Sequence, residues 1–117
     1  MKDSILADKT KDFAIRIINL CKYLTEVKKE YILSKQILRS GTSIGANIRE
    51  ARFAFSKNDF VYKMSISLKE ASETEYWLEL LTETGYISKE MSKSLIDDCV
   101  EILKMLHSTV KTTKQDV

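Results

Sequence analysis

Apolar residues recur at steps of three and four along most of the chain, which is the spacing of helices that bury one face. In the first such stretch these residues are Leu6, Phe13, Ile17, Leu20 and Leu24. The pattern predicts four helices, at residues 3–25, 30–55, 59–84 and 88–111. Residues 112–117 have no apolar period and are expected to fray. Because the connections are short, consecutive helices should run antiparallel, so residues 1–117 are predicted to form one all-α domain, an up-down-up-down antiparallel four-helix bundle.

Residues that favour helix ends lie at the predicted boundaries. Ser56 is followed three residues later by Asp59, which resembles a capping box, although Asn58 could equally be the cap. Gly85 stands where a left-handed C-cap is expected, and Ser88 is a reasonable N-cap for the last helix. These residues therefore separate the third predicted helix from its neighbours.

The second predicted helix contains Gly41 and Gly45 within an otherwise regular apolar pattern. Each interior glycine costs about 1 kcal/mol relative to alanine, so a continuous helix here implies close packing of another backbone over both positions. The alternative is a break, with Gly41 ending one helix and Ser43 capping the next. The pattern favours the continuous helix with a close helix contact at Gly41 and Gly45.

Composition adds few constraints on partners. The chain has no proline, and its 19 basic and 17 acidic residues give a net charge of +2, well below the excess expected of a monomeric nucleic-acid binder. Cys21 and Cys99 lie on apolar stripes without a CxxC spacing and are expected to be buried free thiols in a reducing compartment. No signal peptide or long apolar run is present, so a cytoplasmic protein without a membrane partner is expected.

The sequence offers little for catalysis. Metal-binding helical bundles use inward glutamates and Glu-x-x-His motifs, but this chain has a single histidine, His107, with no carboxylate at that spacing. No serine or cysteine can be matched with a full set of catalytic partners. We therefore expect no catalytic residues, no metal, no cofactor and no small-molecule substrate, and the protein is predicted not to be an enzyme.

Two sets of polar residues suggest other roles. The first set is expected to face inward as a buried polar network, in which the carboxylate of Glu70 accepts hydrogen bonds from Ser40, Ser43 or Asn47. A network that fixes the register of the helices is favoured over a ligand site. The second set is basic, lies on the second helix and could form a nucleic-acid or partner surface: Lys35, Arg39, Arg49 and Arg52. The alternative for this set is an ordinary charged face.

Three runs carry a family resemblance: LRS at residues 38–40, SIGANIREA at 43–51 and SLKEASETEYWL at 67–78. Together they resemble the four-helix-bundle proteins named for 23S rRNA intervening sequences. The resemblance implies a ring-shaped homo-oligomer, expected to be a pentamer. It also implies kinship to the accessory proteins of diversity-generating retroelements, whose basic surface engages nucleic acid and a reverse transcriptase.

These observations lead to two functional hypotheses. The first is a non-catalytic, homo-oligomeric helical scaffold that binds structured RNA or a ribonucleoprotein partner through its basic surface, with a nucleic-acid enzyme as another possible partner. The alternative is a protein-protein assembly module with no nucleic-acid role.

Overall fold

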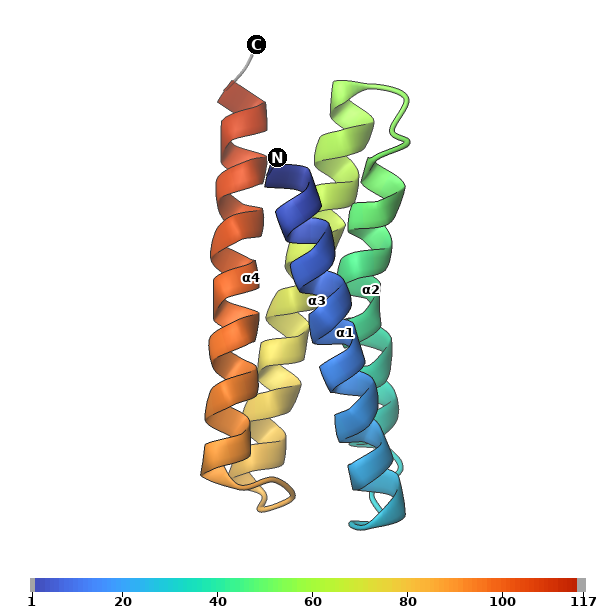
Figure 1. The fold of residues 1–117 in the computed structure, drawn as a ribbon, viewed down its shortest axis with the longest axis vertical. Coiled ribbons are helices and arrows are strands. Elements are labelled where there is room, and N and C mark those ends of the chain that lie inside the picture. Colours follow the sequence, from blue (N-terminus) through green and yellow to red (C-terminus); the bar gives the residue numbers. More distant parts are fainter. Residues whose placement is uncertain (1, 116–117) are drawn as a thin grey trace.

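The computed structural model describes residues 2–115, which form four helices joined by short connections (Figure 1). Their bounds are Lys2–Glu26 for α1, Leu33–Ala51 for α2, Lys57–Glu83 for α3 and Lys89–Gln115 for α4. The helices run alternately up and down, and the bundle measures 49 × 21 × 20 Å. The predicted all-α antiparallel four-helix bundle is confirmed.

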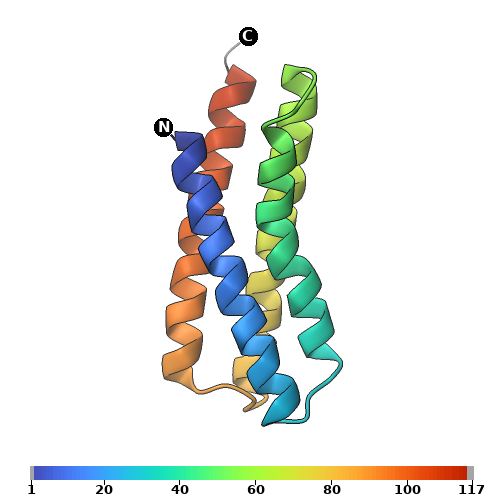
Figure 2. The same ribbon diagram turned by 45° about the vertical axis from the view of Figure 1, so that its right-hand side comes forward.

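Each helix packs mainly on its sequence neighbours, and α1 packs less extensively on α4 than on α2. Two views show α1 beside α4 at its N-terminal end and leaning away from α4 toward the α1–α2 connection (Figures 1 and 2). The core comes from the apolar stripes that the sequence predicts. Its largest fully buried apolar side chains are Phe13, Ile17, Leu24, Ile37, Ile44, Leu78, Leu81, Ile102 and Leu106.

Helix α2 is shorter than the predicted 30–55 at both ends. It ends at Ala51 because the N–H groups of Arg52 and Phe53 donate to the carbonyls of Arg49 and Glu50, three residues back, where the chain leaves the α-helix. It begins at Leu33 because Glu30 caps the helix from outside. The buried carboxylate of Glu30 accepts hydrogen bonds from the backbone N–H groups of Ile32, Leu33 and Ser34 at 3.2, 3.0 and 2.8 Å. These groups have no partner within the helix, so a carboxylate at this end satisfies them and favours the helix dipole. Lys29, with φ of 55°, turns the chain into this arrangement.

The other predicted helix ends are largely correct. Ser56, rather than Asn58, caps α3, since its Oγ accepts from the Asp59 N–H at 3.0 Å. Gly85 adopts the left-handed conformation with φ of 82°, and Ser88 Oγ accepts from the Met91 N–H at 3.2 Å.

The predicted fraying of the C-terminal tail is wrong for residues 112–115, because α4 continues to Gln115. Val110 is still buried in this last part of the helix, and the Thr113 hydroxyl donates to the Thr109 carbonyl at 2.8 Å. Residues 116–117 lie outside the described residues.

The glycine motif lies inside one continuous helix, so the predicted continuity is confirmed and the alternative of a break is wrong. Helix α1 is the close neighbour. A methyl group at Gly41 would lie 2.8 Å from Ile17 Cγ2, and one at Gly45 would lie 3.3 Å from Thr10 Oγ1 and 3.4 Å from the Thr10 carbonyl oxygen. The glycines therefore allow the α1 and α2 backbones to pack more closely than side chains at these positions would permit.

Candidate subunit and nucleic-acid interface

The polar groups between α2 and α3 form buried links that fix how these helices pack. The hydroxyls of Ser40 and Thr74 share a 2.8 Å hydrogen bond, and Ser67 donates to the Ile44 carbonyl at 2.8 Å. Ser40, Ser67 and Thr74 are fully buried. Because each buried hydroxyl has a partner, this network contributes to stability without needing a ligand.

The predicted buried hydrogen bond to Glu70 from Ser40, Ser43 or Asn47 is wrong. The Ser43 hydroxyl donates to the Arg39 carbonyl at 2.7 Å, and the Asn47 amide donates to the Ser43 carbonyl at 2.9 Å. Glu70 lies at the edge of the α2–α3 contact, where its side chain is 20% exposed and accepts from the Arg39 guanidinium at 3.1 Å. The predicted set thus contributes only Ser40 to the buried network, while Ser67 and Thr74 take the role assigned to Glu70.

Arg39 is held by acidic residues of α3 and is therefore not a free cation. Its guanidinium pairs with both Glu70 and Glu73, and Glu73 also accepts a hydrogen bond from the Trp77 indole at 2.9 Å. With its charge locally balanced, Arg39 is a poor candidate for a phosphate contact.

Arg49 and Arg52 meet at a groove between α1 and α2, which we call the basic groove. The groove has a volume of about 510 Å³, and Lys11 of α1 also lines it. Lys11, Arg49 and Arg52 form no ion pair with another described residue, and both arginines are exposed. Of the two acidic residues in the lining, Glu50 is paired with Lys63 at 2.9 Å, whereas Asp8 is exposed and forms no ion pair with another described residue, so three cations face one unpaired carboxylate. The sequence analysis predicted that both arginines belong to a binding surface but missed Lys11. It missed this residue because Lys11 comes alongside the arginines only through the close approach of α1 to α2 at Gly45.

Lys35 lies apart from the basic groove, at the other end of the same pair of helices. It lines a second groove with Ile18, Lys22 and Leu38. Ile18 and Leu38 are 39% and 38% exposed, and Ile15 is also exposed on α1. The α1–α2 face therefore combines exposed apolar side chains, small residues and unpaired cations, a mixture that suits contact with a macromolecule. The four predicted basic residues do not form a single patch.

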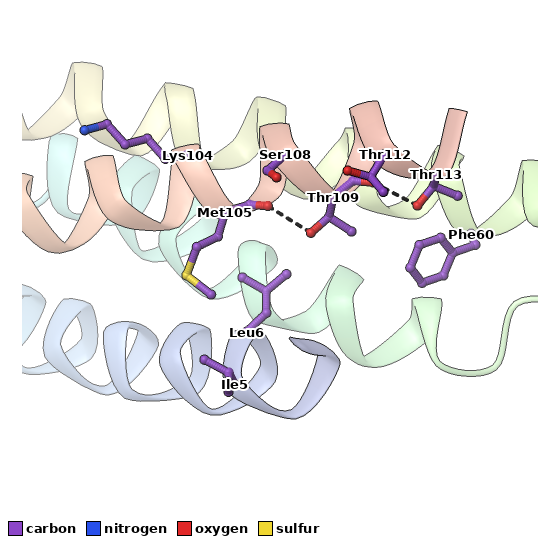
Figure 3. Close-up of a pocket in the computed structure, with 9 residues that line it drawn as sticks. All are labelled: Ile5, Leu6, Phe60, Lys104, Met105, Ser108, Thr109, Thr112 and Thr113. Atoms are coloured by element: carbon purple, nitrogen blue, oxygen red, sulfur yellow. Dashed lines mark hydrogen bonds between the residues drawn. The ribbon is translucent and has the colours of Figure 1, made fainter. Parts of the chain in front are cut away.

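A third cavity, of about 470 Å³, opens between α1, α3 and α4 near the N-terminal end of α1 (Figure 3). Leu6, Phe60 and Met105 give it a mainly apolar lining. The hydroxyls of Thr109 and Thr113 are bonded to carbonyls of their own helix at 2.9 and 2.8 Å. Lys104, Ser108 and Thr112 also line this cavity, and none of them forms an ion pair or a side-chain hydrogen bond with another described residue.

The two cysteines are buried free thiols. Burial raises the pKa of Cys21 to about 11, with a further contribution from Glu30. Burial raises the pKa of Cys99 to about 12, with smaller contributions from Glu75 and Asp98. Such thiols are protonated near neutral pH and are therefore weak nucleophiles.

Within residues 2–115, no three His, Cys, Asp or Glu side chains come together in a way that could hold a metal ion. Over the same part of the chain, no buried side-chain nitrogen or oxygen is left without a hydrogen-bond partner. None of the helices described has the length and apolar character needed to cross a membrane.

Comparisons with known proteins agree with the fold. The sequence profile of the 23S rRNA-intervening sequence proteins matches residues 2–108 of this chain. Among solved structures, the chain is similar to the crystal structure of a protein with unknown function from the S23 ribosomal protein family of Bacteroides thetaiotaomicron VPI-5482. The sequence identity is 58% and the TM-score is 0.93, covering 95% of this chain and 99% of the other. No match was found among curated proteins.

Proposed function

Because this chain belongs to the family of 23S rRNA-intervening sequence proteins, we propose that it is a non-catalytic, homo-oligomeric helical scaffold that binds structured RNA or a ribonucleoprotein partner. The observation that carries this proposal is the basic groove, where Lys11, Arg49 and Arg52 gather without ion-pair partners among the described residues. In this proposal the assembly is a pentameric ring and acts in the cytoplasm.

The low net charge of a single chain suggests that RNA binding depends on assembly of several chains. One chain carries a net charge of only +2, which gives weak attraction to a polyanion. Several copies in one particle present several basic grooves at fixed separations, and linked contacts bind much more tightly than one contact alone. Phosphate binding by such a surface releases counterions and should weaken steeply as salt is raised.

The proposal includes no catalytic role because the buried hydroxyls and thiols are not activated for a reaction. The buried hydroxyls bond to one another or to backbone carbonyls, and both thiols are held protonated by burial. His107 is exposed on α4 and forms no hydrogen bond or ion pair through its side chain with another described residue. These groups stabilise a scaffold and leave no activated group for a reaction.

Binding of labelled 23S rRNA fragments to the purified protein at about 50 and about 200 mM salt tests the proposal. We expect binding at the lower salt and a large loss at the higher salt. The double variant Arg49→Gln with Arg52→Gln should bind more weakly, whereas Lys28→Gln with Lys89→Gln removes the same charge from the other end of the bundle and should bind like the parent protein. Absence of binding at low salt would overturn the RNA-binding proposal.

A second candidate function is a protein-protein assembly module with no nucleic-acid role. The α2–α3 connection favours it, because Phe53 and Phe55 are 75% and 100% exposed there. Exposed aromatic residues are typical anchors of protein interfaces. If this function is correct, the protein should assemble normally, fail to bind RNA at low salt, and lose a protein partner when both residues are replaced by serine.

A further inference from the structure

The second half of α4 carries a row of basic side chains that lies outside the basic groove. We call Lys104, His107, Lys111 and Lys114 the α4 basic row. From Ile102 to Gln115 the chain contains these residues and no aspartate or glutamate. All four side chains are exposed, and none forms an ion pair with another described residue. The row is therefore a source of positive charge separate from the basic groove.

The spacing places the row on one outward face of the helix. Steps of three and four residues bring a cation to the same side about once per turn, roughly every 5.4 Å along the axis. Ser108 and Thr112 add hydroxyls beside the row, and neither forms a hydrogen bond to another described residue. Figure 3 shows Lys104 and Ser108 on the side of α4 away from Leu6, while Met105 points toward Leu6. Lys104, Ser108 and Thr112 also border the cavity of Figure 3, and all three are exposed to solvent.

Ordinary helix stabilisation does not account for the row. Cations in the last turn of a helix interact favourably with its dipole, which could explain Lys114 but not Lys104 or Lys111, which lie outside the last turn of α4. The first half of α4 mixes both signs and contains the ion pair between Lys93 and Asp97. A solvated face usually mixes signs in this way, so the change to one sign after Glu101 is distinctive.

The groove beside the row is open and mainly apolar, with Leu68 of α3 and Leu103 of α4 in its lining together with Lys104, His107 and Lys111. One carboxylate, that of Glu75, stands in the same groove on α3. The positive groups therefore exceed the negative ones along this surface. A regular line of cations and hydroxyl donors is complementary to a regular line of phosphates.

We infer that the α4 basic row is a second RNA-binding surface, which contacts the phosphodiester backbone of the RNA through Lys104, Lys111 and Lys114 with hydroxyl donors beside them. This inference rests on the proposed RNA-binding function and extends it to a helix that lies outside the basic groove. It assigns α4 the recognition of backbone phosphates and no recognition of base sequence.

A charge-neutral triple variant tests the inference: Lys104→Gln, Lys111→Gln and Lys114→Gln in the full chain. Its control is Lys28→Gln, Lys89→Gln and Lys93→Gln, which removes the same charge near the opposite end of the bundle. Because all of these side chains are exposed, both variants should keep the helical content and assembly state of the parent protein. We expect the α4 variant to bind labelled 23S rRNA fragments about tenfold more weakly at about 50 mM salt, with a shallower dependence of affinity on salt, and the control to bind like the parent.

A footprint provides a second measurement that needs no substitution. RNA should protect Lys104, Lys111 and Lys114 from acetylation and leave Lys89 reactive. If the parent protein binds RNA, but the α4 variant binds as tightly as the control and the lysines are not protected, the inference is overturned and the proposed function stands. If the α4 variant loses subunit assembly instead of RNA affinity, the row is a protein contact and the inference is also overturned. If the parent protein binds no RNA at low salt, the proposed function itself fails.

Discussion

Gly41 on α2 faces Ile17 on α1 so closely that a methyl group in place of the glycine hydrogen would lie 2.8 Å from Ile17 Cγ2. Ile17 is fully buried, and its β-branched side chain has few rotamers to move into. Gly41→Ala should therefore destabilise the protein by about 1 to 3 kcal/mol, because overpacking outweighs the gain of about 1 kcal/mol in helix propensity. Urea unfolding followed by circular dichroism measures this change.

A double-mutant cycle separates the clash from other effects of the alanine. Ile17→Ala removes Cγ1 and Cγ2, the two nearest atoms that a methyl group at Gly41 would meet, and keeps Cβ at 3.2 Å. Gly41→Ala should therefore lower the free energy of unfolding by less in that background than in the parent protein. Equal costs in both backgrounds, or a gain in stability from Gly41→Ala alone, would show that close packing is not the reason for the glycine.

The buried hydroxyl pair should matter more for stability than the ion pair beside it. Thr74→Val keeps the shape of the side chain but leaves the buried Ser40 hydroxyl without its interhelix partner, which should cost about 1 to 3 kcal/mol. Glu70→Gln weakens an ion pair whose Arg39 side chain is 49% exposed, so it should cost less than about 1 kcal/mol. Measured free energies of unfolding show which of the two variants is more destabilised, and a larger decrease for Glu70→Gln than for Thr74→Val would contradict the prediction.

The sequence predicted the helices well because their apolar spacing is regular and their caps are local signals. Gly85 and Ser88 could be assigned from neighbouring residues alone. Glu30 was missed as a cap because its carboxylate reaches three backbone N–H groups across a turn, a geometry with no short sequence signature.

The site was predicted less well because it depends on the rotation and separation of helices. Glu70 follows the apolar period of α3 closely enough to be predicted as buried, but it lies at the edge of the contact, where the long side chain of Arg39 reaches it. Lys11 joins Arg49 at the basic groove only because α1 packs closely on α2. The family resemblance was predicted correctly, since it rests on residue identities along the chain and needs no geometry.

The buried thiols should make stability fall in alkaline solution. Their ordinary pKa is 9.0, and burial raises it to about 11 for Cys21 and about 12 for Cys99 in the folded protein. Because the folded state holds these protons to higher pH than the unfolded chain does, their contribution to stability is full below about pH 9 and is lost as the pH rises toward the folded values. Unfolding free energies measured between about pH 8 and about pH 11 should fall less steeply for Cys21→Ala with Cys99→Ala than for the parent protein. Identical slopes would contradict this prediction, since lysine and tyrosine titrations are common to both proteins.

The exposed apolar residues of the α1–α2 face give the most direct test of assembly. Ile18 and Leu38 line one groove and are each more than one-third exposed, so neither is needed to complete the core of a single chain. In the proposed oligomer a neighbouring copy covers them, and a charge placed there would be buried without a partner. Ile18→Glu and Leu38→Glu should therefore reduce the mass measured by light scattering from several chains to one, while the helical content stays unchanged.

Tyr62→Glu, at an exposed aromatic residue on α3, should leave the mass unchanged. A parent protein that is already a monomer at micromolar concentration would refute the oligomer, whereas variants that assemble like the parent would show that the contact lies on another face of the bundle.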